Sequence, residues 1–234
     1  MKREIIQTSD GSTTIHLPDW DESYHSKFGA IQEAIHVFLK SGFSLYEGKA
    51  VSILEVGFGT GLNAFLTLLE SQKRNENVEY VGVEAYPISM EEIALMNYAS
   101  ELGSDNDLFL NLHETEWETP VVISPSNFGN GEWSNSGKFT LTKRKQFFNE
   151  IEDREKFDLI YFDAFGFRVQ PELWTVEIFQ RMFDALKPNG VLVTYAARGV
   201  VKRNMIEVGF TVEKLAGPPG KREMFRARKI RNGK

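Results

Sequence analysis

The chain of 234 residues contains no cysteine, and this absence removes several kinds of chemistry. Disulfide bridges, thiolate metal sites and a cysteine nucleophile are all excluded. Histidine is also scarce, and His16, His36 and His113 do not show the spacing of metal ligands. We interpret these three histidines as structural and expect no metal site.

Long apolar runs are missing as well. Residues 1–7 lack the apolar segment of a signal peptide. No run approaches the roughly 20 apolar residues that a membrane-spanning helix needs. We therefore expect a soluble, cytoplasmic protein that does not contact a membrane.

Charge is unevenly distributed along the chain, whose net charge is −6. Residues 198–234 hold 11 Lys and Arg against 3 Asp and Glu, whereas residues 1–197 hold 16 against 30. A basic C-terminal region on an acidic body favours a polyanionic partner. A solvated basic surface explains the same charge without any partner.

A glycine-rich turn follows the first strongly apolar segment, residues 50–58. The turn and its flanks read Leu54-Glu55-Val56-Gly57-Phe58-Gly59-Thr60-Gly61-Leu62-Asn63. Glycine permits the backbone angles of such a turn and lets a ligand approach the main chain closely. A helix over 62–72 and a second strand over 78–85 are expected next. This order of elements is how a doubly wound sheet forms a nucleotide pocket.

Two carboxylates favour S-adenosylmethionine (SAM) as the ligand of that pocket. Glu84 ends the second strand and can accept hydrogen bonds from both ribose hydroxyls. Glu55 is expected at the mouth of the pocket, where its charge would repel a pyrophosphate and suit the sulfonium and ammonium groups of SAM. An ordinary glycine-rich turn is the alternative. The predicted cofactor-binding residues are Glu55, Gly57, Phe58, Gly59, Gly61, Asn63 and Glu84.

The rest of the chain alternates between strand and helix patterns. Further strands are expected at 157–163, 190–195, 210–215 and 223–229, and helices at 27–40, from Pro87 to about 101, at 171–186 and at 199–208. Asp10-Gly11 is typical of a hairpin turn, and residues 121–124 and 139–142 of two strands around an exposed loop over 126–138.

This alternation predicts a Rossmann-like α/β fold: a mostly parallel seven-stranded sheet with an antiparallel C-terminal pair, helices on both faces, and a hairpin near 120–147. Seven such strands are common among SAM-dependent methyltransferases. We expect one domain over 1–234, with an N-terminal extension and lid over 1–49 and the core over 50–234.

Asp163 ends another predicted strand and is the candidate catalytic residue. Ligands of open α/β sheets bind beyond the carboxyl ends of the strands, so Glu84 and Asp163 are expected to face one crevice. Asp163 would then lie beside the transferred methyl group. A helix-capping or turn residue is the alternative, which the aromatic neighbours Phe162, Phe165 and Phe167 make less attractive.

Several segments together resemble one family of tRNA methyltransferases, which makes 5-methylaminomethyl-2-thiouridine at the wobble position. The most specific match is Asp163-Ala164-Phe165 with Gln170-Pro171-Glu172-Leu173-Trp174-Thr175, which is similar to the family pattern D-x-F…N-P-x-x-W-T. The glycine-rich turn also matches, as do Asp10-Gly11-Ser12, residues 24–38 and Lys221-Arg222-Glu223-Met224. The resemblance extends from residue 10 to about 226.

The resemblance implies SAM as cofactor and N-methylation of 5-aminomethyl-2-thiouridine in tRNA. In many bacteria this methyltransferase is fused to an FAD-dependent oxidase, for which no room follows residue 234. A stand-alone methyltransferase is therefore expected, with a separate oxidase acting on the same nucleoside. Relatives carry Gly-Asp where this chain has Gln146-Phe147, so Gln146 is the expected adenine contact.

The remaining candidates concern the substrate. Aromatic side chains could stack on an extruded base, and cations late in the chain could contact phosphates of the anticodon arm. Core packing for the aromatic residues, and a surface position for His25 in the expected lid, are the alternatives. The candidate substrate-binding residues are Tyr24, Phe165, Phe167, Arg198, Lys202, Lys221 and Arg222.

Two other functions fit parts of the sequence. A SAM methyltransferase acting on a small amine or another RNA would share Glu55, Glu84 and the glycines. A SAM-binding protein without catalysis would need the pocket but not Asp163. The first of these would explain the basic C-terminal region and residues 163–175 less well.

Overall fold

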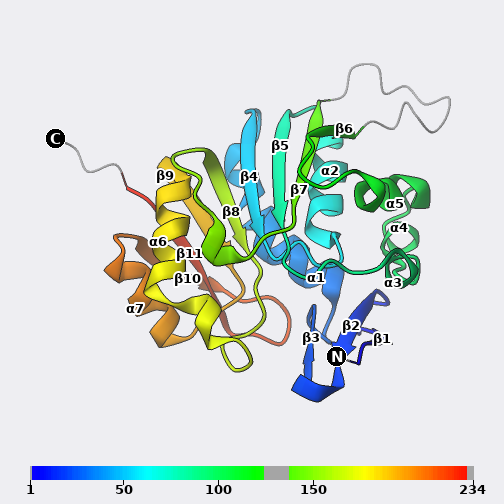
Figure 1. Cartoon of the computed structure of the whole chain (residues 1–234), viewed down its shortest axis with the longest axis horizontal. Coiled ribbons are helices and arrows are strands. Elements are labelled where there is room, and N and C mark those ends of the chain that lie inside the picture. Colours follow the sequence, from blue (N-terminus) through cyan, green and yellow to red (C-terminus); the bar gives the residue numbers. More distant parts are fainter. Residues whose placement is uncertain (1, 124–136, 231–234) are drawn as a thin grey trace.

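The structure is a computed structural model that describes residues 2–123 and 137–230. Eight strands form its main sheet in the order β10-β11-β9-β8-β4-β5-β7-β6 (Figure 1). Their bounds are β4 Val51–Val56, β5 Val78–Val83, β6 Val121–Ile123, β7 Phe139–Arg144, β8 Phe157–Phe162, β9 Leu186–Thr194, β10 Thr211–Ala216 and β11 Glu223–Arg228. The five strands from β9 to β7 are parallel, whereas β11 and β6 run antiparallel to their neighbours.

Helices cover both faces of this sheet, as the alternating pattern predicts. They are α1 Ala30–Ala34, α2 Leu62–Arg74, α3 Met90–Ile93, α4 Tyr98–Glu101, α5 Asn106–Glu114, α6 Val176–Ala185 and α7 Gly199–Glu207. Every residue of β4 is buried, because a central parallel strand has helices on both sides. The predicted Rossmann-like fold class is confirmed.

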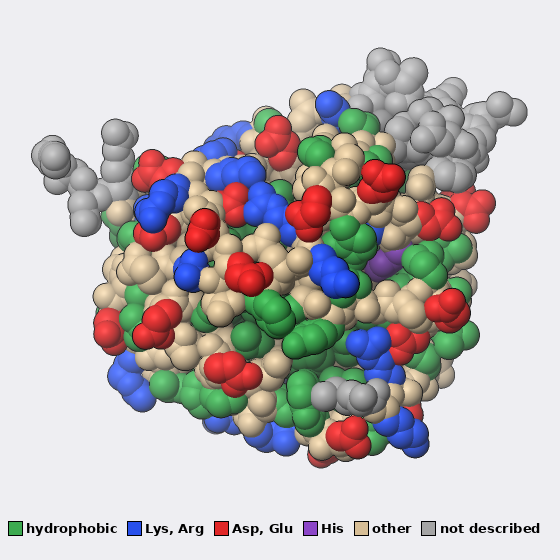
Figure 2. Space-filling view, viewed as in Figure 1, with side chains coloured by type: hydrophobic (Ala, Val, Ile, Leu, Met, Phe, Trp, Pro, Cys, Tyr) green, Lys and Arg blue, Asp and Glu red, His purple; other side chains and the backbone are tan. Residues whose placement is uncertain are grey.

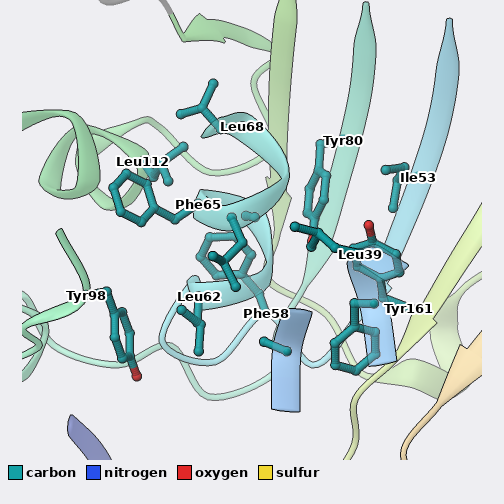
Figure 3. Packing of buried hydrophobic residues seen from close by; sticks show 14 of the residues in the cluster. Leu39, Ile53, Phe58, Leu62, Phe65, Leu68, Tyr80, Tyr98, Leu112 and Tyr161 are labelled. Atoms are coloured by element: carbon teal, nitrogen blue, oxygen red, sulfur yellow. The ribbon is translucent and has the colours of Figure 1, made fainter. Parts of the chain in front are cut away.

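Two apolar cores fill the space between the layers. Figure 3 shows the first, in which Leu62, Phe65 and Leu68 of α2 lie beside Tyr80 of β5 and Tyr161 of β8. The second core packs α6 and α7 against the opposite face of the sheet. The two cores hold the strand ends in fixed positions, and the functional residues follow those ends.

The sheet has one strand more than the seven expected. β6 pairs with β7 in the predicted hairpin, and this pairing adds β6 to the sheet edge as an eighth strand. The loop expected over 126–138 lies almost entirely outside the described residues. The antiparallel C-terminal pair, β10 with β11, is confirmed.

Three predicted helices differ in their boundaries. The helix expected from Pro87 begins instead at Met90, because Ser89 and Glu92 form a capping box, and the chain divides into α3 and α4. Between them the Asn97 side chain binds Gly11 and Thr13 of the N-terminal hairpin, so a tertiary contact replaces helix continuation.

The other two helices begin later than expected. Thr175 caps α6, and residues 171–174 form a separate 3₁₀ turn. In the segment 27–40, α1 begins at Ala30 and is followed by a π-helical turn over Ile35–Lys40. The strand expected at 190–195 begins earlier, since β9 includes residues 186–189.

The N-terminal residues form a small sheet of their own. β1 Glu4–Gln7, β2 Thr13–Leu17 and β3 Glu22–Ser23 pair antiparallel, which confirms the hairpin turn at Asp10-Gly11. Asp10 accepts a hydrogen bond from the backbone N–H of Gln32 and so fixes the hairpin to α1. This sheet lies beyond the ends of β4 and β5 that lead into the site (Figure 1).

The space-filling view shows how the charges are distributed on one face. Acidic and basic side chains are interspersed over the face seen in Figure 2, so no field of one sign covers it. Among the helices of the described residues, none is long and apolar enough to cross a membrane. In the same part of the chain, no group of three or more His, Asp or Glu side chains is arranged to hold a metal ion.

We expect Gly57→Ala to destabilise the fold strongly. Gly57 has φ +94°, and an added Cβ would lie 2.5 Å from the backbone oxygen of Asp163. Urea denaturation should show a loss of roughly 3 kcal/mol in the free energy of unfolding. Gly48→Ala is the matched control, because Gly48 also has positive φ (+73°) but no atom within 4 Å of the added Cβ. Equal losses in the two variants would contradict the proposed role of this backbone contact.

Candidate active site

A cleft of about 1250 Å³ opens at the carboxyl ends of the parallel strands. This is where open α/β sheets bind ligands, at the point where the strand order reverses. Its walls include the turn after β4, the segment after β5, the loop after β8, and residues 20–28 of the N-terminal region. Glu84 and Asp163 both line it, as their positions at strand ends predict.

Asn63 connects two carboxylates at the base of the cleft. Its Nδ2 donates to Oε1 of Glu55 at 2.9 Å and to Oδ2 of Asp163 at 2.8 Å. The hydroxyl of Tyr80 donates to the other oxygen of Glu55 at 2.8 Å. Glu55 is 0% exposed and does not line the cleft, so the expectation that Glu55 lies at the mouth was wrong. The first turn of α2 covers Glu55 and presents Asn63 in its place.

Burial changes the protonation of both carboxyl groups. It raises the pKa of Glu55 well above its ordinary range, against the hydrogen bonds from Asn63 and Tyr80. Burial also raises the pKa of Asp163 to about 7, with the Asn63 hydrogen bond acting in the opposite direction. Near neutral pH, Asp163 therefore populates both its protonated and its ionised form. Such a group is suited to accept or return a proton.

Glu84 holds the turn after β4 in place. Its carboxylate accepts from the backbone N–H of Gly59 and from that of Tyr86, each at 3.0 Å. Gly57 and Gly59 line the cleft, whereas Gly61 lies beside His113 and does not. The positive φ angles expected for these glycines are present, but at Gly57 and Gly61 the close neighbour is the protein itself.

Two exposed aromatic rings, which the sequence motifs did not predict as site residues, lie at the end of the cleft beside Glu84. Tyr86 is 65% exposed and Phe147 is 50% exposed, and their ring centroids lie 5.8 Å apart, edge to face. Phe147, Phe148 and Asn149 line the cleft, but Gln146, the expected adenine contact, does not. The only sequence feature that could have indicated this contact was the aromatic residue Phe147 itself.

The structure separates the candidate substrate-binding residues into groups. Tyr24 and Phe165 line the cleft with their rings 4.9 Å apart. Phe167, Arg198 and Arg222 line an adjoining cavity of about 620 Å³ instead. The two remaining candidates are Lys221, which lines both cavities, and Lys202, which lines neither.

The Lys221 side chain contacts other residues of the protein. Its ammonium group forms an ion pair with the buried Glu33 and lies 3.9 Å from the centroid of the Tyr195 ring. Glu33 and Tyr195 both line the cleft and were not predicted, because nothing in the sequence indicates that they meet Lys221. Glu33 belongs to α1, Tyr195 follows β9, and Lys221 lies in the loop before β11, so only tertiary packing brings the three together.

His25 lines the cleft rather than standing on an outer surface. Its Nδ1 lies 3.0 Å from the Thr14 hydroxyl, and burial lowers the pKa of His25 to about 4. The imidazole is therefore neutral at physiological pH. This part of the N-terminal region forms a wall of the cleft beside Tyr24.

The donor set of the cleft fits SAM. Glu84 offers carboxylate oxygens beside the turn after β4, where a ribose would lie. Oδ1 of Asn63 is buried and has no hydrogen-bond partner among the described residues, so it can accept from an ammonium group. The aromatic rings of Tyr86 and Phe147 provide flat apolar surface for an adenine.

Comparison with known proteins agrees with SAM as the ligand of the cleft. A family described as S-adenosyl-L-methionine-dependent methyltransferase matches residues 138–230. The crystal structure of MNMC2 from Aquifex aeolicus superposes with a TM-score of 0.68 at 27% identity, covering 97% of this chain and 70% of that one. Spermidine synthase from Thermotoga maritima, with a TM-score of 0.55 and 14% identity, covering 97% of this chain and 72% of that one, shares the fold.

Two curated relatives are tRNA 5-methylaminomethyl-2-thiouridine biosynthesis bifunctional proteins MnmC. The protein from Burkholderia multivorans is 29% identical over 91% of this chain and 33% of its own length. The protein from Cupriavidus metallidurans is 30% identical over 96% of this chain and 34% of its own length. This chain thus spans about a third of the length of these relatives.

The fold and the cleft define a methyltransferase of the Rossmann-like class, and the matched family implies that it uses SAM. Within that class, the similarity along nearly the whole chain identifies an MnmC methyltransferase-like protein. The resemblance deduced from residues 163–175 and the glycine-rich turn is thereby confirmed.

The raised pKa of Asp163 predicts a pH-dependent cost in stability. Between its ordinary pKa of 3.8 and the folded value of about 7, the folded chain binds more protons than the unfolded chain. The free energy of unfolding therefore falls as pH rises through this range. Asp163→Asn removes the effect and should be more stable than the parent at about pH 8, by on the order of 2 kcal/mol.

Urea denaturation of both proteins at about pH 5 and about pH 8 tests this prediction, since the advantage of Asp163→Asn should grow with pH. The same advantage at both pH values would show that Asp163 has an ordinary pKa in the folded chain.

Proposed function

We propose that this chain is a SAM-dependent N-methyltransferase that converts 5-aminomethyl-2-thiouridine to 5-methylaminomethyl-2-thiouridine at the tRNA wobble position. The observation that carries the proposal is Asp163, a carboxyl group with pKa about 7 at the base of a cleft whose other end fits a nucleoside. The names of the MnmC relatives supply the nucleoside and the tRNA.

The cofactor would occupy the side of the cleft formed by β4 and β5. Glu84 would bind the ribose hydroxyls, Tyr86 and Phe147 would contact the adenine, and Asn63 would accept from the ammonium group. When bound, SAM supplies an electrophilic methyl group. Glu55 would act indirectly, by holding the Asn63 amide through its hydrogen bond of 2.9 Å.

The acceptor amine must lose a proton before it can react, because an ammonium group has no free electron pair. Asp163 would hydrogen-bond this amine, orient it and take up its proton, directly or through water. Once it has passed this proton to water, its ionised form would also stabilise the positive charge that develops on nitrogen. Tyr24 and Phe165 would stack on the extruded base from the opposite wall.

The basic C-terminal residues would contact the anticodon arm, and such contacts make RNA binding strongly salt-dependent. We further propose that the chain acts as a single methyltransferase domain in the cytoplasm. A separate FAD-dependent oxidase would supply the aminomethyl nucleoside.

Glu84→Gln should weaken SAM binding by roughly tenfold to a hundredfold, because a charged acceptor for the ribose is lost. Isothermal titration calorimetry with SAM measures the change. Glu172→Gln is the matched control, since Glu172 also lines the cleft but makes no hydrogen bond to the turn after β4 among the described residues. An unaltered affinity in Glu84→Gln would remove Glu84 from the cofactor site.

Methyl transfer from labelled SAM into tRNA from cells that lack this protein tests the function directly. Nucleoside mass spectrometry should show a gain of one methyl on 5-aminomethyl-2-thiouridine. Asp163→Asn should keep SAM affinity within a few fold and lose most turnover, by about a hundredfold or more. Labelling of another nucleoside, or SAM binding without any transfer, would refute the proposed substrate.

A further inference from the structure

The loop after β8 serves two cavities. Asp163 and Phe165 point into the cleft, whereas Gly166 and Phe167 line the adjoining cavity. The Trp174 indole N–H donates to the backbone oxygen of Phe165 at 2.8 Å and fixes the point where the loop changes direction. Glu22, Tyr195 and Lys221 line both cavities, so the two spaces adjoin each other.

Phe167 provides a partly exposed flat surface in the second cavity, and a cation faces it. The guanidinium carbon of Arg198 lies 5.6 Å from the centroid of the Phe167 ring. A guanidinium plane and an aromatic ring are the two surfaces on which unpaired nucleic-acid bases stack. The cavity volume of about 620 Å³ is sufficient for one nucleotide.

The charge of this cavity is positive. Its two carboxylates already have cationic partners, because Glu22 pairs with Arg168 and Glu223 pairs with Lys214. Arg198 and Arg222 form no ion pair with a carboxylate of the described residues, and both are exposed. These two guanidinium groups are thus available to an anion.

The positive charge continues beyond the cavity onto α7. Lys202 and Arg203 of α7 likewise form no ion pair within the part of the chain that the structure describes. The other cations of 198–230 are all paired: Lys214, Lys221, Arg226, Arg228 and Lys229. Within residues 198–230, the cations without an ion pair among the described residues therefore lie at the second cavity and on α7.

We propose that the second cavity binds the nucleotide next to the methylated one in the same RNA strand. Its base stacks on the part of the Phe167 ring that is exposed in the cavity, and a flanking phosphate binds Arg198 and Arg222. This inference rests on the proposed function, because it takes the target nucleotide to occupy the cleft beside Asp163. Tyr195 and Lys221, which separate the two spaces, would lie under the connecting backbone.

The test uses an RNA stem-loop of the anticodon arm that carries 5-aminomethyl-2-thiouridine, with two further versions abasic at the 5′ or the 3′ neighbour. Phe167→Leu should weaken binding of the intact stem-loop by about tenfold, as measured by fluorescence anisotropy, and raise its KM. One of the two abasic versions should bind the parent protein about tenfold more weakly and should be insensitive to Phe167→Leu.

Phe183→Leu is the matched control, because Phe183 also lies under a cation, Lys229 at 4.9 Å, but away from both cavities. It should leave RNA affinity unchanged. SAM affinity should stay within about twofold in Phe167→Leu, since the cofactor binds elsewhere in the cleft. Arg198→Gln and Arg222→Gln should each lower the slope of log affinity against log salt by about one, whereas Phe167→Leu should not change it.

The outcomes separate the two proposals. If Phe167→Leu weakens the intact and both abasic stem-loops equally, or none of them, the nucleotide subsite is refuted while the methyltransferase function stands. If the parent protein binds the stem-loop but does not methylate it, the proposed function fails, and the binding data alone decide the subsite. Absence of any RNA binding by the parent protein would overturn the subsite.

Discussion

The site depends on one side-chain amide. Nδ2 of Asn63 joins Glu55, on β4, to Asp163, at the end of the neighbouring strand β8. Two carboxylates held this close in a buried region resist ionising together, and burial alone already raises the pKa of both. The amide relieves part of this cost, and it leaves Asp163 as the group that faces the cleft with a pKa of about 7.

The backbone supports the same arrangement. β4 and β8 are parallel neighbours, so their ends emerge side by side, and the absence of a side chain at Gly57 lets the two turns touch. Glu84 at the end of β5 then fixes the turn from the other side through the N–H of Gly59. The geometry of the cleft therefore follows from strand order and from a few short contacts, rather than from the surface loops alone.

The two sides of the cleft, on either side of Asn63 and Asp163, are lined by different kinds of residue. The β5 side ends in exposed aromatic rings, Tyr86 and Phe147, and fits a nucleoside cofactor. The other side leads past Tyr195 and Lys221 into a cavity lined by Phe167 and by Arg198 and Arg222, which form no ion pair with a described residue. The proposed transfer from a small cofactor to an RNA chain would use this asymmetry, since the RNA would have to continue out of the site.

The sequence by itself determined the fold class and the residues at strand ends, because apolar periodicity and glycine-rich turns are local signals. It placed Glu84 and Asp163 in one cleft correctly. Only the tertiary structure decided that Glu55 is buried behind Asn63, that Phe147 and not Gln146 lines the cleft, and that Lys221 pairs with Glu33. Lys221 and Glu33 are far apart in the chain, and side-chain direction at all of these positions is set by packing, which no local pattern encodes.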